Sequence, residues 1–276
     1  LAGPSSRYRF YQFLPYLEKE GFYISVSPFF NEKYVNNLYS DYRTINFLNP
    51  FIAYLKRISE LLFHGSYDLV WMEKEALPWI AAPLEKFIYN KSVPYVIDYD
   101  DAIYHRYDQH HNPLVRFLLS TKIEKIMSSS TVVVAGNKYI ADYAQKAGAP
   151  MVEIIPTVVD IRNYTYTGKK DFIPSSFRIG WLGSPSTSRH IKVAAQALKS
   201  FCQRKDVLFV AIGARQEDLD KIPGRLIVWN KETEIEELSC FDVGIMPLPD
   251  TPWERGKCGF KLIQYMAAGL PVIASP

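Results

Sequence analysis

FDVGIMPLPDTPWERGKCGFKLIQYMAAGLPVIASP, residues 241–276, is the stretch that decides the fold of this chain. Its residue pattern predicts a strand at 242–246, a loop at 247–255 and a helix over 257–268 that ends at Gly269. A further strand begins at 271–274. A strand, a helix and a strand in this order indicate a parallel sheet, because parallel neighbours need a crossover connection. The stretch therefore predicts an α/β domain.

The same alternation continues toward the N-terminus. Strands are predicted at 177–182, 207–212 and 226–229, with helices over 188–201 and 235–239. Further upstream the predicted strands are 67–72, 94–98, 131–135 and 153–155, and the predicted helices are 51–63, 76–89, 113–127 and 137–147. The chain opens with a predicted helix over 6–20, kinked at Pro15, and a strand at 23–27. Such alternation predicts parallel sheets covered by helices.

Residues 156–176 interrupt this alternation with two prolines, Gly168 and a polar run, a composition typical of a linker. We expect two Rossmann-like domains, over 1–160 and 177–276, joined by a linker over 161–176. The chain begins directly with a helix and stops within an apolar strand. We therefore expect truncation at both ends, with the first strand and the C-terminal end missing.

Composition narrows the class of protein. The 276 residues are 48% hydrophobic and 22% charged, which is typical of a folded globular protein. The net charge of +3 is too small to predict nucleic-acid binding, but it allows attraction to an anionic membrane surface. The three cysteines are not spaced as metal ligands are, so we expect no metal site. We expect their thiols to be reduced and the protein to be cytoplasmic, either in solution or at the inner face of the membrane.

An anion site is predicted at the start of the helix over 257–268. Gly259 permits close approach of a ligand to the backbone, and free N–H groups at a helix N-terminus favour a diphosphate. Lys257 and Lys261 are four residues apart, so they are expected on one face of the first turn. The alternative is a pair of solvated lysines.

A second phosphate cradle is predicted where the strand at 177–182 gives way to a small-residue loop and a helix. The residues able to donate to a phosphate there are Gly183, Ser184, Ser186, Thr187 and Arg189. The alternative is that the hydroxyl groups only cap the helix.

An acidic loop, DYDDAIYH at 98–105, follows the strand at 94–98. Ligands of open α/β sheets bind at the carboxyl ends of strands. Asp100 and Asp101 can therefore accept sugar hydroxyls or stabilise positive charge, with Glu73 and Glu75 as weaker candidates. The alternatives are a divalent metal site and a solvated acidic loop.

The segment from 242 onward closely resembles the donor-binding segment of retaining GT-B glycosyltransferases of family 4. The matching residues are Gly259, Phe260, Met266, Ala267, Ala268, Gly269, Pro271 and Val272. The resemblance implies a GT-B fold of two domains facing a cleft, with the donor in the C-terminal domain. It implies transfer from a UDP- or GDP-sugar to a glycan or lipid-linked acceptor, with retention and without an obligatory metal or cofactor.

The resemblance also implies residue roles. It makes Asp101 and Asp100 candidates for catalysis. The candidates for acceptor binding are Ser6 and Arg7 in the opening loop and His105 after the acidic residues. The family carries two glutamates separated by seven residues, where this chain has Gly256 and Gln264. Gln264 can still bind a ribose diol, and Glu254 is the expected substitute for the first glutamate.

The two missing glutamates keep other functions open. A nucleotide-sugar epimerase of GT-B fold and a non-catalytic module that binds nucleotide sugars are the alternatives to a glycosyltransferase of polysaccharide or glycoconjugate biosynthesis. A dinucleotide oxidoreductase is disfavoured, because no Gly-x-Gly-x-x-Gly follows a predicted strand.

Overall fold

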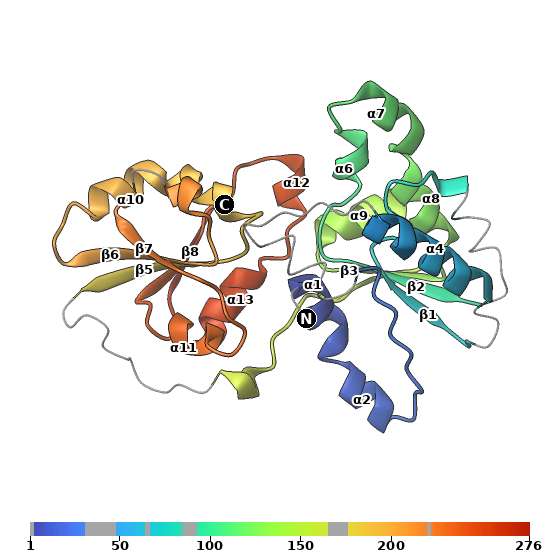
Figure 1. Cartoon of the computed structure of the whole chain (residues 1–276), viewed down its shortest axis with the longest axis horizontal. Helices are drawn as coiled ribbons and strands as arrows, with labels where there is room; N and C mark the ends of the chain where they lie inside the picture. The colour runs from blue at the N-terminus through green and yellow to red at the C-terminus, as the bar shows by residue number, and fades with distance from the viewer. Residues whose placement is uncertain are drawn as a thin grey trace. The chain divides into compact units, whose positions relative to one another are not determined.

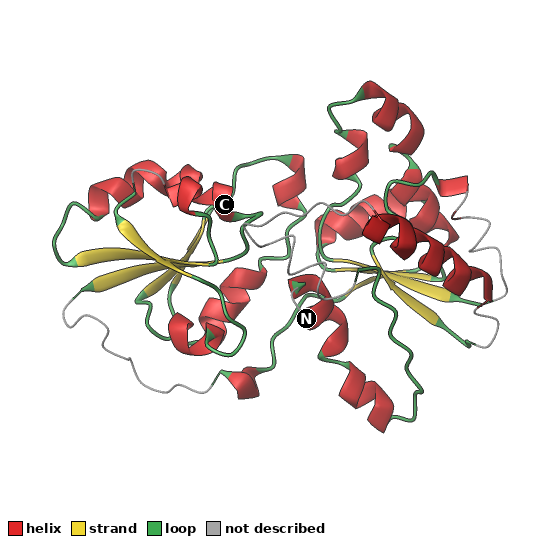
Figure 2. Cartoon of the chain, viewed as in Figure 1, coloured by secondary structure: helices red, strands yellow, loops and turns green. Residues whose placement is uncertain are grey.

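A computed structural model describes residues 3–30, 48–63, 67–83, 85, 93–164, 176–219 and 222–276. Within these residues the chain forms two compact units, each built on its own parallel sheet (Figures 1 and 2). Unit 1 comprises Leu1–Thr157 and Pro252–Cys258, and unit 2 comprises Val158–Thr251 and Gly259–Pro276. The predicted α/β class with two parallel-sheet domains is confirmed, whereas the domain limits at 160 and 176 stay a prediction.

Unit 1 contains a four-stranded sheet of order β1-β2-β3-β4, all parallel. The strands are β1 (Val70–Glu73), β2 (Tyr95–Tyr99), β3 (Val132–Ala135) and β4 (Val152–Ile154). Ile97, Tyr99 and Val133 are fully buried in its core. Burial on both faces explains why these strands appear in the sequence as short apolar runs without polar alternation.

The helices of unit 1 connect these strands. They are α4 (Leu48–Phe63), α6 (His105–Asp108), α7 (Pro113–Leu119), α8 (Lys122–Ser129) and α9 (Lys138–Lys146), with the short α12 (Pro252–Arg255). α9 packs on β3 and β4, begins at an Asn137 cap and ends before Gly148, which adopts a left-handed φ of 81°. The helix expected over 113–127 is divided at Ser120 and Thr121 into α7 and α8.

The opening segment differs partly from expectation. It is a run of α1 (Pro4–Ser6), the π-helix η1 (Arg7–Tyr11) and α2 (Leu14–Lys19), and the helical run is interrupted just before Pro15, where a kink is expected. The strand predicted at 23–27 is wrong. Residues 22–28 are irregular, and Tyr23 is fully exposed, because no described strand lies beside them to complete a sheet ladder.

The helix predicted over 76–89 is wrong only in its first part, because residues 82, 83 and 85 are helical whereas 76–81 are not. Residues 77–79 form a turn, in which Trp79 has a left-handed φ of 62° that a helix does not contain. Residues 84 and 86–89 of that prediction lie outside the described part of the chain.

Unit 2 contains a five-stranded parallel sheet of order β7-β6-β5-β8-β9. The strands are β5 (Phe177–Leu182), β6 (Val207–Ile212), β7 (Gly224–Ile227), β8 (Val243–Met246) and β9 (Val272–Ala274). Side chains alternate between its two faces: Trp181 and Phe209 pack in one core cluster, Leu182 and Val210 in the other. Both faces are therefore covered, as Figure 2 shows for this unit.

Helices cover each face of this sheet. The 3₁₀-helix η3 (Ser188–Ala194) and α10 (Ala195–Phe201) lie on one face, and α11 (Glu234–Leu238) and α13 (Phe260–Ala267) on the other (Figure 1). Shorter 3₁₀ turns are η2 (Ile161–Asn163) and η4 (Gln216–Leu219). The described helices include none that is both long and apolar enough to cross a membrane.

Candidate functional site

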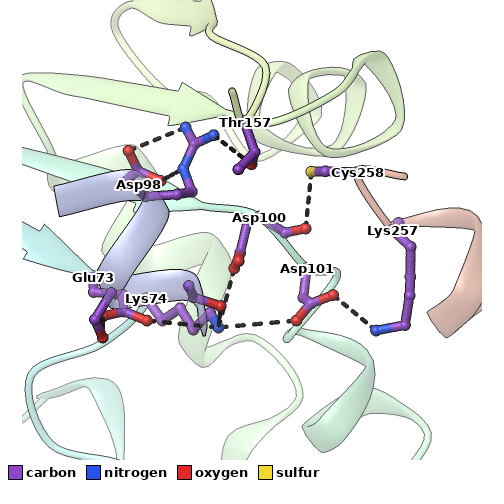
Figure 3. A network of polar contacts seen from close by, with 12 residues as sticks. Glu73, Lys74, Asp98, Asp100, Asp101, Thr157, Lys257 and Cys258 are labelled. Atoms are coloured by element: carbon purple, nitrogen blue, oxygen red, sulfur yellow. Dashed lines mark hydrogen bonds and ion pairs between the residues drawn. The ribbon is translucent and has the colours of Figure 1, made fainter. Parts of the chain in front are cut away.

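Charged side chains gather at the carboxyl ends of β1 and β2 in unit 1 (Figure 3). β1 ends at Glu73, and β2 ends at Tyr99, directly before Asp100 and Asp101. Because the two strands are parallel neighbours, their carboxyl ends meet at one edge of the sheet. This edge is where ligands of α/β sheets bind.

Asp98, which lies within β2, forms a buried ion pair. The Arg9 guanidinium donates to both carboxylate oxygens of Asp98, with 3.1 Å between Nη2 and Oδ2. The same guanidinium donates to the Ile155 carbonyl at 2.8 Å and to Thr157 Oγ1 at 3.0 Å. Burial raises the pKa of Asp98 to about 6, although Arg9 opposes this shift. Asp98 therefore ties the opening helix to β2 and the segment after β4.

Lys74 organises the two following carboxylates, and the sequence analysis did not identify it. Its Nζ lies 3.0 Å from Asp100 Oδ1, 3.9 Å from Asp101 Oδ2 and 3.1 Å from Ser5 Oγ. Burial favours the neutral form of Asp100, but Lys74, the hydrogen bond from Ser5 and the charge of Arg9 together outweigh it, so the pKa of Asp100 is lowered. Lys74 also has a left-handed φ of 64°, which is uncommon for a residue with a side chain.

Lys257 contacts the other side of Asp101. Its Nζ lies 3.0 Å from Asp101 Oδ1, so Asp101 stands between two lysines (Figure 3). The position of Lys257 corrects the expected helix over 257–268. α13 begins only at Phe260, after Gly259 in a left-handed conformation with φ 62°. The first-turn pairing predicted for Lys257 and Lys261 is therefore wrong.

The segment Pro252–Cys258, which carries Lys257, packs within unit 1 although the strands on either side of it belong to unit 2. Asn137 Nδ2 donates to the carbonyls of Gly256 at 2.9 Å and Lys257 at 3.2 Å. Cys258 Sγ donates to the Asp100 carbonyl at 2.9 Å. Burial raises the pKa of this thiol to about 12, so it stays protonated and able to donate. These bonds fix Lys257 beside the acidic loop.

Gly256 has a steric explanation. A Cβ at this position would lie 2.3 Å from Ala102 Cβ and 2.8 Å from the Ala102 backbone nitrogen, much closer than real Cβ atoms approach. No glutamate side chain fits there in this structure. Glu254 is buried on α12, and its role as a substitute stays a prediction.

Two residues of the candidate acceptor site are engaged within unit 1. Ser6 Oγ donates to Glu73 Oε2 at 2.5 Å, which brings Ser6 to the same sheet edge. Both ring nitrogens of His105 have partners, Nδ1 at 3.0 Å from Asp108 Oδ1 and Nε2 at 3.0 Å from the Tyr139 hydroxyl. Arg7 lies over the Tyr8 ring, 4.5 Å from its centroid.

Glu75 does not belong to this edge. It is buried and pairs with the fully buried Lys122 at 2.7 Å, and the Tyr107 hydroxyl donates to it at 2.8 Å. Lys122 also lies 3.2 Å from Glu85. This buried group stabilises the loop after β1, so the cleft-facing role considered for Glu75 is wrong.

Unit 2 brings together two segments that the sequence analysis treated as separate anion sites. Lys261 on α13 has its Nζ 3.4 Å from Thr187 Oγ1 and 4.6 Å from the centroid of the Trp181 ring. Gly183 makes this approach possible, since a Cβ there would lie 2.5 Å from the Trp181 ring and 2.9 Å from Lys261 Cε. One cation therefore lies beside the hydroxyl-rich loop after β5.

The hydroxyls of this loop are linked to one another. Ser184 Oγ lies 2.8 Å from Ser186 Oγ, and Thr187 Oγ1 donates to the Ser184 carbonyl at 3.1 Å. Arg189 is exposed on η3, whereas the next residue, His190, is buried. Hydroxyls and a lysine at the carboxyl end of β5 are a suitable arrangement for an anionic group.

Gln264 is buried on α13 and has a partner that the sequence analysis missed. Its Nε2 donates to Glu234 Oε1 at 2.8 Å, and the indole nitrogen of Trp229 donates to the other oxygen of the same carboxylate. The sequence contained one signal for this partner, because Glu234 lies at the start of α11, the first helix after β7. Among the described residues, no group of three or more His, Cys, Asp or Glu side chains is arranged to hold a metal ion.

Comparison with known proteins confirms the resemblance predicted from the motif. Residues 176–276 match the profile of the family described as "Glycosyl transferases group 1". No match was found among curated protein sequences. The match covers the β-sheet of unit 2 together with both of its anion-site segments.

Solved structures extend the likeness over both units. HepE from Anabaena, solved with UDP and glucose, has 16% identity and a TM-score of 0.57, over 95% of this chain and 70% of that one. The UDP-forming trehalose-phosphate synthase of Burkholderia vietnamiensis has 13% identity and a TM-score of 0.56, over 82% and 64% of the two chains. At these identities the likeness establishes the GT-B fold.

The chain is shorter than these proteins. It spans 62% of the trehalose-6-phosphate synthase OtsA, with which it shares 11% identity over 82% of its own length and a TM-score of 0.55.

Proposed function

We propose that the protein transfers a sugar from a nucleoside-diphosphate sugar to an acceptor. The observation that carries the proposal is the position of Lys261 beside the loop after β5, within the segment that matches group 1 glycosyltransferases. Lys261 Nζ, the hydroxyls of Ser184 and Thr187 and the N-terminus of α13 supply donors for a diphosphate. We assign the donor to this part of unit 2.

The donor diphosphate is the leaving group in such a transfer. Charge develops on its bridging oxygen as the bond to the sugar breaks, and fixed cations and N–H groups stabilise that charge. Lys261 is the residue to which we assign this role, because its side chain is held between Trp181 and Thr187. No metal is required by this scheme, and we infer retention of anomeric configuration from the family resemblance.

UDP-sugars are the donors we test first, because HepE was solved with UDP and the Burkholderia enzyme is UDP-forming. GDP-sugars remain in the proposal. Gln264 is not assigned to the ribose through its amide nitrogen, since that nitrogen donates to Glu234 Oε1 at 2.8 Å and to the Tyr164 hydroxyl at 3.4 Å. Any contact of Gln264 with a ribose hydroxyl uses its amide oxygen.

The acceptor is assigned to unit 1. Asp101 and Asp100 stand at the sheet edge where acceptor hydroxyls would bind, with their charge balanced by Lys74 and Lys257. Their carboxylate oxygens can accept a hydrogen bond from a hydroxyl. We propose a glycan or lipid-linked acceptor, a role in polysaccharide or glycoconjugate biosynthesis, and a cytoplasmic location in contact with the inner membrane surface.

The test incubates the full chain with a panel of UDP- and GDP-sugars, with and without glycan and lipid-linked acceptors. Release of free nucleoside diphosphate that depends on acceptor supports the proposal. An isomerised sugar recovered without an acceptor would instead identify an epimerase. Donor binding by calorimetry without any turnover would identify a non-catalytic nucleotide-sugar-binding module, an alternative motivated by Gly256 in place of a glutamate.

A further inference from the structure

The helix α7 presents apolar side chains on both of its sides. Leu119 is buried in the core of unit 1, and Val115 packs against the same core. The side chains of Leu114, Phe117 and Leu118 point outward and are 61%, 82% and 56% exposed. Their spacing of three and four residues places them on one face of the helix. The outward face is therefore a continuous apolar stripe.

This stripe stands at the end of a projecting part of unit 1. Figure 1 shows α6 and α7 extending away from the sheet of that unit. The Trp79 side chain, 47% exposed, packs on the residues that lead to α7: its ring lies 5.6 Å from the His110 ring and 5.3 Å from the Tyr107 ring. The Trp79 backbone N–H donates to the Tyr107 hydroxyl at 3.1 Å, which holds the loop against α6.

The segment that carries the stripe has no acidic residue, and Asp108, which directly precedes it, pairs with His105. Residues 109–121 contain no Asp or Glu, one arginine and two histidines. Arg116 donates to the carbonyls of His110 at 2.5 Å and His111 at 3.1 Å, so its cation is held against the residues that precede α7. A cation together with exposed Leu, Phe and Trp is the composition of interfacial segments that bind anionic lipid surfaces.

We propose that Trp79, Leu114, Phe117 and Leu118, the α7 surface, insert into a lipid bilayer that carries anionic headgroups. The inference names the contact surface for the membrane association proposed above. Three helix side chains and one indole expose a few hundred Å², well below the roughly 800 Å² per partner of a stable protein interface. Apolar side chains that penetrate a bilayer need no such area, because each is surrounded by acyl chains.

The experiment measures sedimentation of the full chain with vesicles of phosphatidylcholine, with and without phosphatidylglycerol. Wild type is expected to bind the phosphatidylglycerol vesicles more tightly. The double variant Phe117→Ser, Leu118→Ser should lose about tenfold or more in partitioning, because two side chains no longer leave water. A matched control, Phe201→Ser with Val228→Ser, removes two exposed apolar side chains of unit 2 and should bind as wild type does.

Because Phe117 and Leu118 are exposed, the variant should unfold at the temperature of wild type, and this is measured alongside. No binding of wild type to phosphatidylglycerol vesicles, or equal binding by the variant, would overturn the proposal. So would a dimer in solution that the variant abolishes while vesicles fail to bind, since a second copy would then cover the surface. The assay uses neither donor nor acceptor, so its failure is distinct from failure of glycosyl transfer.

Discussion

Two lysines of one sequence motif have different neighbours in this protein. Lys257 pairs with Asp101 at 3.0 Å in unit 1, whereas Lys261 reaches Thr187 Oγ1 at 3.4 Å in unit 2. Gly259 lies between them in a left-handed conformation with φ 62°, and α13 begins after it at Phe260, one residue before Lys261. Each lysine therefore supports a separate prediction, and only Lys261 is assigned to the donor phosphates.

Replacement of Lys261 by alanine should weaken binding of the nucleoside diphosphate itself. Loss of one charge-assisted contact is expected to lower affinity by about tenfold to a hundredfold. Calorimetry with UDP and GDP measures this, and Lys199→Ala, which removes a lysine from α10, is the control. Unchanged affinity for the nucleotide that wild type binds would place Lys261 outside the donor site.

Gly256 should resist replacement even by the residue that the family carries. Gly256→Ala is expected to lower the free energy of unfolding by about 1–3 kcal/mol, because the added Cβ overlaps Ala102, and Gly256→Glu by at least as much. Gly3→Ala is the control, since a Cβ at Gly3 meets nothing nearer than 3.5 Å. Chemical denaturation measures all three variants. Equal stability of Gly256→Ala and wild type would contradict this packing.

At the scale of elements, Asn137 joins a helix to a segment distant in sequence. Its side-chain oxygen accepts from Ile140 N at 3.0 Å as the cap of α9, while Nδ2 donates to the carbonyls of Gly256 and Lys257. One side chain thus stabilises both α9 and the segment that places Lys257 beside Asp101. The adjacent Gly136 permits this packing, since a Cβ there would overlap Cys258 Sγ.

Asn137→Ala should therefore cost more than the loss of an ordinary helix cap. Asn112→Ala removes a cap of the same kind from α7, where Asn112 Oδ1 accepts from Leu114 N at 2.9 Å, and is expected to cost about 1 kcal/mol. Asn137→Ala should cost roughly 1–2 kcal/mol more, because two further hydrogen bonds are lost. Denaturation curves for the two variants measure the difference, and equal losses would restrict Asn137 to capping.

The sequence predicted elements well where burial produced a pattern, and poorly where tertiary contacts decided. β5 has the predicted limits, and β2, β3 and β8 lie within a residue of theirs, because buried parallel strands are short apolar runs. The start of α13 was missed, since the residues before it pack against Ala102 and Asn137, which are far away in sequence. Lys74 and Glu234 were missed because only their spatial partners distinguish them from solvated charges.

At the scale of the whole molecule, a buried glutamate should make stability depend on pH. Lys122 pairs with two glutamates inside unit 1, and one of them, Glu75, also lies 3.8 Å from the Arg106 guanidinium. Burial, partly offset by Lys122, raises the pKa of Glu85 to about 7 from an ordinary value of 4.5. Between these values the folded state binds more protons than the unfolded state, so the free energy of unfolding falls as pH rises.

The variant Glu85→Gln should remove this dependence. The stability difference between wild type and Glu85→Gln is expected to shift by about 3 kcal/mol between pH 4.5 and 8, to the disadvantage of wild type at the higher pH. Asp98, whose pKa is also raised, contributes equally to both proteins and cancels in the difference. Chemical denaturation across this range measures it, and parallel stability curves for the two proteins would refute it.

The chain passes between the two units three times, at Thr157–Val158, Thr251–Pro252 and Cys258–Gly259. A chimaera of two related enzymes, joined within residues 161–176, would therefore combine one parent's acidic loop with the other parent's 252–258. The close fit of Gly256 on Ala102 and the bonds from Asn137 would then be formed between residues that never evolved together. A recombination that keeps both units intact must take residues 252–258 from the parent that supplies the N-terminal part. The set of residues that has to be inherited together is therefore discontinuous in sequence.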